Sequence, residues 1–333
     1  MQRVTNDSAK TLAIVVPAYK TAYLRQALEA IARQTNRDFT VYVFDDCSPE
    51  PVEAIVREFS DRVPLQFHRF PENMGRQSLA RHWERCLRLT QEPWIWLFSD
   101  DDTMDPGCVA DFLAERERTR SGHDAYRFDT DMIDGAGVVI RPATPNPAEE
   151  YGAAFLMDRW REARTNCLQE LIFSRDAWQA LGGIPDYPLG WHSDDALTAR
   201  LAVRRPVRRI EGSKIHWRWS GANISTGGRG PSVARLIRAS SEFLPWAVAF
   251  IREHDAASAA EARRLSERWF FKFLSGNWKF LGMDSCLAIE GLTRGTWGHW
   301  PGWGLLAAMG SNVKVFGLKC KGAMRRLQPR PAK

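Results

Sequence analysis

The chain has 333 residues, of which 44% are hydrophobic and 26% charged, and this composition excludes disordered and collagen-like classes. At about 150 residues per domain, the length predicts about two domains. The formal net charge of +6 comes from the end of the chain, because residues 301–333 hold seven bases and no acid. The first 300 residues hold the other 39 bases and all 40 acids, so their net charge is close to zero. We therefore expect no nucleic-acid partner.

The six cysteines are scattered and form no Cys-x-x-Cys pair, which is typical of a reducing compartment. The start, MQRVTNDSAK, is polar and lacks the features of a secretory signal, and no run reaches the ~18 apolar residues of a transmembrane helix. We therefore expect a cytoplasmic protein, and peripheral attachment to the cytoplasmic face of the membrane stays an open alternative.

Short apolar runs alternate with helical patterns in the first third of the chain. Thr21 is the expected cap of the first helix and Ser48 of the second. The apolar runs predict four buried strands, at residues 12–19, 41–46, 64–70 and 94–98. This alternation predicts an α/β fold, with a mixed, mostly parallel sheet flanked by helices and with ligands at the carboxyl ends of the strands.

The rest of the chain is expected to add a smaller mixed region and then a helical one. Ser193 is the expected cap of a short helix, and from about Pro231 the pattern is helical, aromatic and amphipathic. The expected domains are residues 1–228, with a first part at 11–105 and a second part at 106–228, and a C-terminal helical region at 229–333.

Three adjacent acids, Asp100, Asp101 and Asp102, follow the strand at residues 94–98. Neighbouring carboxylates repel one another unless a cation neutralises them. At the carboxyl end of a strand they indicate a divalent metal, Mg²⁺ or Mn²⁺, held by one or two carboxylates and by substrate phosphates. The alternative is a solvated acidic turn before a helix that begins near Pro106.

Two further acidic positions are candidates for function. Asp46 ends the second strand, where it could bind a nucleoside or only complement the next helix. Asp194 and Asp195 lie near the expected start of a helix, which favours the ionised carboxylate needed by a base that deprotonates a hydroxyl; a helix-dipole role is the alternative. Trp191 and His192 would then contact an acceptor, or they pack in the core.

The segments VVPAYK, VFDDCSPE, NMGRQSLARHW and FSDDDTMDP, followed by Gly-Gly-Ile-Pro and Ser-Asp-Asp, occur in an order and spacing that resemble the inverting GT-A glycosyltransferases of family 2, over about residues 12–225. The resemblance implies a GT-A, Rossmann-like fold, a nucleotide-diphospho-sugar donor and a divalent metal. It makes residues 11–105 the nucleotide-binding part and residues 106–228 the acceptor part. The positions that it assigns to the donor are Pro17, Ala18, Tyr19, Asp46, Arg81, Asp100 and Asp101.

The resemblance also makes Asp102, with Asp100, the metal motif, Asp195 the catalytic base, and Asp194 a neighbour of the acceptor. Two departures predict weaker metal dependence: Ser99 replaces an acid that the family often has, and Ser220 replaces a histidine. His216, four residues earlier, would point elsewhere or substitute only approximately. Arg229, in the loop TGGRG, would close over a diphosphate, or the loop is an ordinary flexible one.

The function expected from these residues is inverting transfer of a sugar from a nucleotide-diphospho-sugar, with a UDP-sugar as first choice. The acceptor would be a hydroxyl of a saccharide or a lipid-linked acceptor, in cell-surface polysaccharide or glycolipid synthesis. One alternative is a metal-dependent nucleotidyltransferase or phosphotransferase, although no glycine-rich lysine loop follows the first strand. The other is a non-catalytic, membrane-binding relative.

The C-terminal region combines aromatic and basic residues over helical patterns such as RLSERWFFKFLSGNWKFL. Basic amphipathic helices with aromatic residues can lie in an anionic membrane interface, and the acid-free tail would strengthen that attachment. The alternative is that the aromatic residues form the core of the helical region itself.

Overall fold

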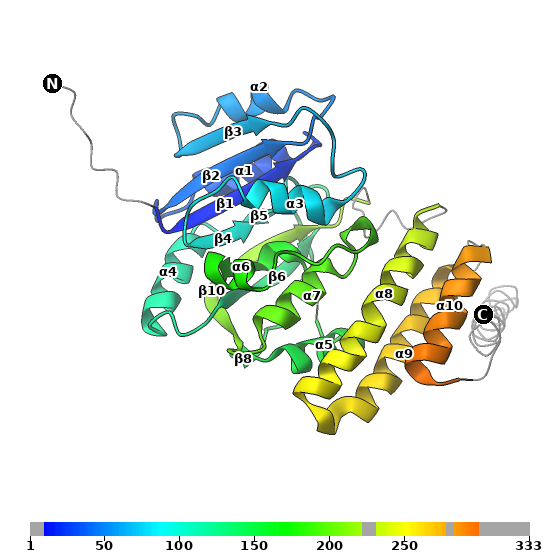
Figure 1. Ribbon diagram of the computed structural model, residues 1–333. Coiled ribbons are helices and arrows are strands. Elements are labelled where there is room, and N and C mark those ends of the chain that lie inside the picture. The colour runs from blue at the N-terminus through cyan, green and yellow to red at the C-terminus, as the bar shows by residue number, and fades with distance from the viewer. Residues whose placement is uncertain (1–9, 165, 222–230, 278–282, 300–333) are drawn as a thin grey trace, which may run out of the picture. The chain divides into compact units, whose positions relative to one another are not determined.

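The computed structural model describes residues 10–164, 166–221, 231–277 and 283–299 (Figure 1). Two units can be distinguished in the chain, Met1–Asn223 and Ile224–Lys333, and each is described by itself. Arg229, the candidate diphosphate residue, lies outside the described residues. So do residues 300–333, which hold the basic tail.

The first unit is built on one mixed sheet. Its strands are β1 (Leu12–Ala18), β2 (Phe39–Asp45), β3 (Leu65–Arg69), β4 (Trp94–Leu97), β5 (Thr103–Met104), β6 (Ala125–Ile133), β7 (Val139–Arg141), β8 (Glu149–Glu150), β9 (Leu171–Ser174) and β10 (Val207–Arg218). The order is β3-β2-β1-β4-β9-β6-β10-β5, with β7 paired to β6 and β8 to β10.

Strands β3, β2, β1 and β4 run parallel, and Leu12 of β1 pairs with Phe39 of β2 and Trp94 of β4. Strand β9 is antiparallel to both β4 and β6, and β10 is parallel to β6. The carboxyl ends of β1, β4, β6 and β10 therefore meet at the same edge of the sheet. This edge carries the acidic triplet, as expected for ligand sites in such folds.

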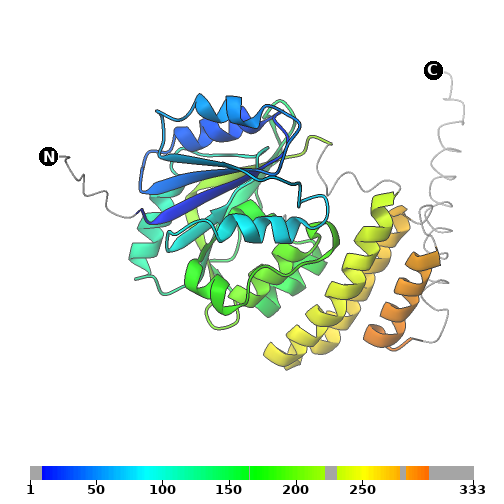
Figure 2. The ribbon, with the colours of Figure 1, turned by 45° about the horizontal axis from the view of Figure 1, so that its top comes forward.

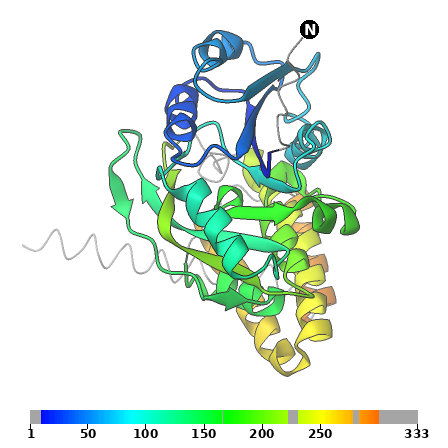
Figure 3. The same cartoon turned by 90° about the vertical axis from the view of Figure 1, so that its left-hand side faces the viewer.

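Helices cover both faces of the sheet, because β1 is apolar on both sides. Leu12, Ile14 and Val16 pack into one buried cluster with α1 (Leu24–Ala32), α2 (Val52–Arg57) and α4 (Cys108–Arg118). Ala13 and Val15 pack into the other cluster with α3 (Leu79–Leu87), α6 (Arg175–Ala180) and α7 (Ser193–Leu201). Figure 3 shows α1 and α3 on opposite sides of β1. Each fully buried aliphatic side chain stabilises the fold by roughly 1.5–3 kcal/mol, so this strand anchors the unit.

The helices of the first unit fill the connections between the strands. They are α1 (Leu24–Ala32), α2 (Val52–Arg57), α3 (Leu79–Leu87), α4 (Cys108–Arg118), α5 (Gly152–Arg161), α6 (Arg175–Ala180) and α7 (Ser193–Leu201), with 3₁₀ turns η1 (Leu168–Glu170) and η2 (Pro188–Gly190). The α/β fold with a mixed sheet flanked by helices is confirmed.

Three of the expected helix caps are wrong. Helix α1 begins after Tyr23, and the backbone and side chain of Thr21 donate to Glu50 instead. Helix α2 begins after Pro51 rather than Ser48, whose hydroxyl donates to the carbonyl of Tyr19. His192, not Ser193, precedes α7. In the first two cases the hydroxyl has bonded to a partner outside its helix.

The second unit is helical, with α8 (Pro231–His254), η3 (Ala256–Ser258), α9 (Ala259–Asn277) and α10 (Met283–Trp297), and its three long helices are visible in Figure 2. Phe270 is fully buried, and the ring of Trp297 packs against it at a tilt, with the centroids 5.7 Å apart, while its indole N–H donates to Ser266 at 3.0 Å. These aromatic residues therefore form the core of the helical unit. In the described part of the chain, none of the helices has the length and apolarity needed to cross a bilayer.

Candidate functional site

The acidic triplet joins the carboxyl ends of three strands. The backbone N–H groups of Tyr19 and Lys20 at the end of β1 donate to Asp100 at 3.0 and 3.2 Å. The N–H of Arg218, the last residue of β10, donates to Asp102 Oδ1 at 2.7 Å. Asp102 is only 1% exposed, so this segment is not the solvated acidic turn that was the alternative.

The triplet carries buried negative charge. Burial, followed by the charge of Asp101, raises the pKa of Asp100 to about 6 and that of Asp102 well above its ordinary value. In the part of the chain that the structure describes, the carboxylate of Asp102 forms no ion pair. A cation at this position would remove the repulsion and hold both acids ionised.

The triplet can hold a divalent metal only if a bound substrate or water supplies further metal ligands. The closely spaced carboxylate oxygens of the triplet suit Mg²⁺ or Mn²⁺. Among the described residues, however, no three His, Cys, Asp or Glu side chains group closely enough to hold a metal alone. A metal here would take Asp102 and Asp100 from the protein and its other ligands from phosphate and water.

Arg218 is a buried cation beside the triplet that the sequence did not reveal. The residue is 1% exposed. Its guanidinium donates to the backbone carbonyl of Asp101 at 2.7 Å and to that of Asp134 at 3.0 Å, and it lies 4.3 Å from the centre of the Tyr23 ring. It therefore ties the triplet to the turn between β6 and β7.

Asp46, expected at the nucleoside, is 3% exposed and already holds three partners. It accepts from the N–H groups of Met74 and Gly75 at 3.0 and 2.8 Å, and it forms an ion pair with Arg85. These contacts fix the loop before α3. The geometry gives Asp46 a role in shaping this loop, and nucleoside contact stays a prediction.

The other donor candidates lie around the ends of β1 and α3. Ala18 is buried and Pro17 half-buried, while Tyr19 is 42% exposed at the end of β1. Arg81 is exposed on the first turn of α3, where its N–H is capped by Ser78. Tyr19 and Arg81 are therefore open to a ligand, and their roles stay predictions.

The second acidic site lies at the start of α7. Asp195 is 5% exposed and accepts from Arg159 at 2.7 Å, from His192 at 3.0 Å and from Asn166 at 3.1 Å. Asp194 accepts from the N–H of Asp195 at 2.9 Å and from Asn166 at 3.1 Å. The two carboxylates therefore share one amide donor.

The surroundings separate the pKa values of these two acids. Burial opposes ionisation of Asp195, but Arg159 and the hydrogen bond from His192 outweigh it and hold its pKa well below the ordinary value. Burial and the charge of Asp195 raise the pKa of Asp194 to about 7. Asp195 is therefore ionised at neutral pH, as a base must be.

His192 and Trp191 precede this pair. His192 is 5% exposed with φ of 71°, and burial lowers its pKa, so the neutral ring donates from Nδ1 to Asp195. Trp191 packs edge-on against it at 5.4 Å. The structure shows His192 orienting Asp195, and acceptor contact by either residue stays a prediction.

A short segment of chain, Asn166 to Glu170, contacts both acidic sites. Asn166 donates to Asp194 and Asp195, and Gln169 donates to Asp102 Oδ2. No sequence motif marked Asn166, Gln169 or Arg159. A polar residue before an apolar strand is a weak signal, and only the folded chain brings these groups to the acids.

His216 does not substitute for the missing histidine at the triplet. Its Nε2 is bonded to Asp105 at 2.9 Å, and its Nδ1 lies 3.8 Å from Asp131. It therefore points elsewhere, which was one of the two expectations for it.

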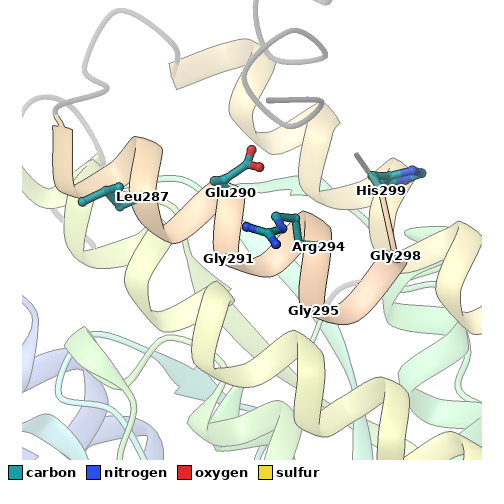
Figure 4. A pocket seen from close by; sticks show the side chains of 7 residues that line it. All are labelled: Leu287, Glu290, Gly291, Arg294, Gly295, Gly298 and His299. Atoms are coloured by element: carbon teal, nitrogen blue, oxygen red, sulfur yellow. The ribbon is translucent and has the colours of Figure 1, made fainter. Parts of the chain in front are cut away.

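The second unit has a groove of its own on α10. Its volume is about 630 Å³, and Gly291, Gly295 and Gly298 line it with Leu287, Glu290, Arg294 and His299 (Figure 4). The lining combines one carboxylate with one guanidinium and one imidazole, and we assign no chemistry to it.

Residues 13–165 match the family described as Glycosyl transferase family 2. An uncharacterized glycosyltransferase of Haemophilus influenzae is 32% identical over 96 residues, which are 28% of this chain and 31% of that protein. A hyaluronan synthase of Pasteurella multocida is 28% identical over 161 residues, 46% of this chain and 15% of that protein. The chain thus spans less than a third of the length of these curated relatives.

Solved structures of S. aureus TarS, residues 1–349, are similar in fold. The complex with UDP-GlcNAc superposes with a TM-score of 0.64 at 12% identity, covering 91% of this chain and 88% of that one. The complex with UDP gives 0.61 at 13% identity, covering 94% and 92%. Residues 13–165 therefore form a region that is similar to glycosyl transferase family 2, and the likeness to the TarS structures shows that the chain has the GT-A fold.

Proposed function

We propose that this protein is an inverting glycosyltransferase that moves a sugar from a nucleotide-diphospho-sugar to a hydroxyl of a saccharide or lipid-linked acceptor, in cell-surface polysaccharide or glycolipid synthesis. The observation that carries the proposal is the pairing of two acidic sites through one segment, with Asp102 at one end and the ionised Asp195 at the other. UDP is the first choice of nucleotide, supported by the TarS complexes with UDP and UDP-GlcNAc.

Asp195 is the proposed base. Arg159 and His192 keep it ionised, and its place in the first turn of α7 adds the favourable helix dipole. To accept a proton it exchanges one of its present hydrogen bonds for the acceptor hydroxyl. The hydroxyl then attacks the anomeric carbon from the face opposite the diphosphate, so a single displacement inverts the configuration.

Asp100 and Asp102 are the proposed ligands of a divalent metal. When bound, the metal would stabilise the negative charge of the leaving diphosphate. The exposed ring of Tyr19 and the guanidinium of Arg81 are the proposed contacts for the nucleotide, and Arg229 would add a cation near the diphosphate.

The test is to incubate the full chain with a panel of UDP-, GDP-, dTDP- and CMP-sugars, with and without Mn²⁺, and to measure both binding and products. We expect metal-dependent binding of one nucleotide class and release of its nucleoside diphosphate or monophosphate. Pyrophosphate would indicate a nucleotidyltransferase instead. No binding and no product would leave a non-catalytic relative as the function.

A peripheral membrane attachment through residues 229–333 belongs to the same proposal, because a lipid-linked acceptor would lie at a membrane surface. Flotation with anionic liposomes tests it. The full chain should float and a chain ending at residue 299 should not. Equal flotation of both would remove the role of the basic tail.

A further inference from the structure

One segment of chain holds side chains of both acidic sites in place. The Gln169 residue is 3% exposed, and its amide donates to Asp102 Oδ2. Three residues earlier, the amide of Asn166 donates to Asp194 and Asp195, at 3.1 Å each. The orientation of the triplet is therefore linked to that of the proposed base through a few backbone bonds.

The segment is itself fixed on both sides. The indole N–H of Trp96, on β4, donates to the carbonyl of Gln169 at 2.7 Å. Glu170 accepts from Thr130 of β6 at 3.0 Å and lies 3.3 Å from Arg127. The segment then continues into β9, between β4 and β6. These anchors give it little freedom to shift either amide.

The choice of amides matters chemically. A carboxamide donates a hydrogen bond without adding a positive charge, so it orients a carboxylate and leaves its charge uncompensated. A carboxylate offers about four lone-pair sites, and Asp102 uses three of them for Gln169, the N–H of Arg218 and the side chain of Ser99. Asp102 therefore keeps a site for a further ligand, in an orientation that its donors determine.

We propose that Asn166 and Gln169 are positioning residues: Gln169 orients Asp102 toward the donor site, and Asn166 aims the Asp194–Asp195 pair at the acceptor hydroxyl. This inference rests on the proposed glycosyltransferase function. It predicts that the two amides, although close in sequence, control different steps, donor binding for Gln169 and turnover for Asn166.

The experiment compares Gln169→Met and Asn166→Leu in the full chain with two matched controls. Gln34 and Asn146 are buried amides that bond to backbone carbonyls and to residues outside the two acidic sites, so Gln34→Met and Asn146→Leu should lose stability without a change at the site. Calorimetry gives the affinity for Mn²⁺ and a UDP-sugar without turnover, and steady-state kinetics give kcat and KM.

We expect Gln169→Met to weaken Mn²⁺-dependent donor binding by about 10- to 100-fold, the effect typical of losing a group that orients a metal ligand. Asn166→Leu should leave donor binding within about twofold and lower kcat by about 10- to 100-fold. Asn166→Gln, which keeps the amide, should restore part of kcat.

Two results would overturn the inference, and they are distinguishable. If both variants bind donor and turn over like the two controls, the amides are only structural and the positioning roles fail while the function stands. If the wild-type chain neither binds nor cleaves any sugar nucleotide, the proposed function itself fails, and the roles fail with it.

Discussion

Arg159 donates from Nε to the carboxylate of Asp195 at 2.7 Å, so the proposed base lies in an ion pair that the acceptor must partly displace. Asp195 is nearly buried, while the side chain of Arg159 is 27% exposed. The guanidinium can therefore move toward solvent when an acceptor arrives. Until then it holds the base ionised and in place.

Replacing Arg159 with Met should raise the pKa of Asp195, because the cation that lowers it is lost. The fall of kcat on the acid side should then move to higher pH, toward the range of an ordinary carboxylate. The loss of unfolding free energy should be roughly 2 kcal/mol, since the pair is not fully buried. Rate profiles against pH and urea unfolding measure the two effects.

Arg161→Met is the matched control. Arg161 pairs with Asp158 on the same helix, and its side chain is 44% exposed. Its loss should change stability by at most about 0.5 kcal/mol and leave the pH profile unchanged. A profile for Arg159→Met that coincides with that of Arg161→Met would contradict the assignment of Asp195 as base.

The architecture could be predicted from the sequence because buried strands and amphipathic helices leave strong patterns. The runs at β1, β2 and β4 are apolar on both faces, and acids lie at the end of β2 and shortly after β4. Helix caps were less predictable, because the hydroxyls of Thr21 and Ser48 could bond either to the next helix or to a residue distant in sequence. In the structure both bond to the distant residue, Glu50 for Thr21 and Tyr19 for Ser48.

The groups that orient the acids could not be predicted. Arg218 lies 116 positions from Asp102, and Arg159 lies 36 positions from Asp195. A sequence pattern marks the acid, because three adjacent carboxylates are unusual. It does not mark the single arginine or amide that the fold brings to it, since buried arginines and amides also serve purely structural networks, as Arg127 does with Glu150.

Asp195→Asn and Asp102→Asn should separate turnover from donor binding. Asparagine cannot act as a base, so Asp195→Asn should bind donor normally and lose about 10²- to 10⁴-fold in kcat. Asp102→Asn removes a charge from the triplet and should weaken metal-dependent donor binding. Calorimetry measures donor binding and product assays measure turnover in both variants. An equal loss of donor binding in the two would refute the division of roles.

Asp194 should make the protein less stable as pH rises. Burial and the charge of Asp195 raise its pKa in the fold to about 7, above its value in the unfolded chain, so the folded state binds the extra proton. The stability that this proton provides is complete below about pH 4 and is lost as pH rises through 7.

In Asp194→Asn the titrating group is gone. The melting temperature of the variant relative to wild type should therefore increase by a few degrees between pH 5 and pH 8, with about 2–4 °C for each kcal/mol in a unit of this size. Calorimetric melts at several pH values measure the difference. A difference that stays constant across this range would show that Asp194 does not titrate there.

Gly75→Ala should disrupt the loop that Asp46 holds. A Cβ at Gly75 would lie 2.7 Å from Asp46 Oδ2, and that carboxylate cannot move freely because Met74 and Arg85 also bind it. The loop or the carboxylate must shift, so we expect a lower melting temperature and weaker nucleotide binding. Thermal melts and calorimetric titration with UDP measure both.

The control for this substitution is Gly276→Ala, in α9. An added Cβ there meets nothing within 4 Å, and alanine in a helix is more stable than glycine by about 0.5–1 kcal/mol. This variant should therefore melt slightly higher than wild type and bind nucleotide equally well. If Gly75→Ala behaved the same way, the network around Asp46 would be loose enough to yield, and its carboxylate would be free to turn toward a nucleoside as first expected.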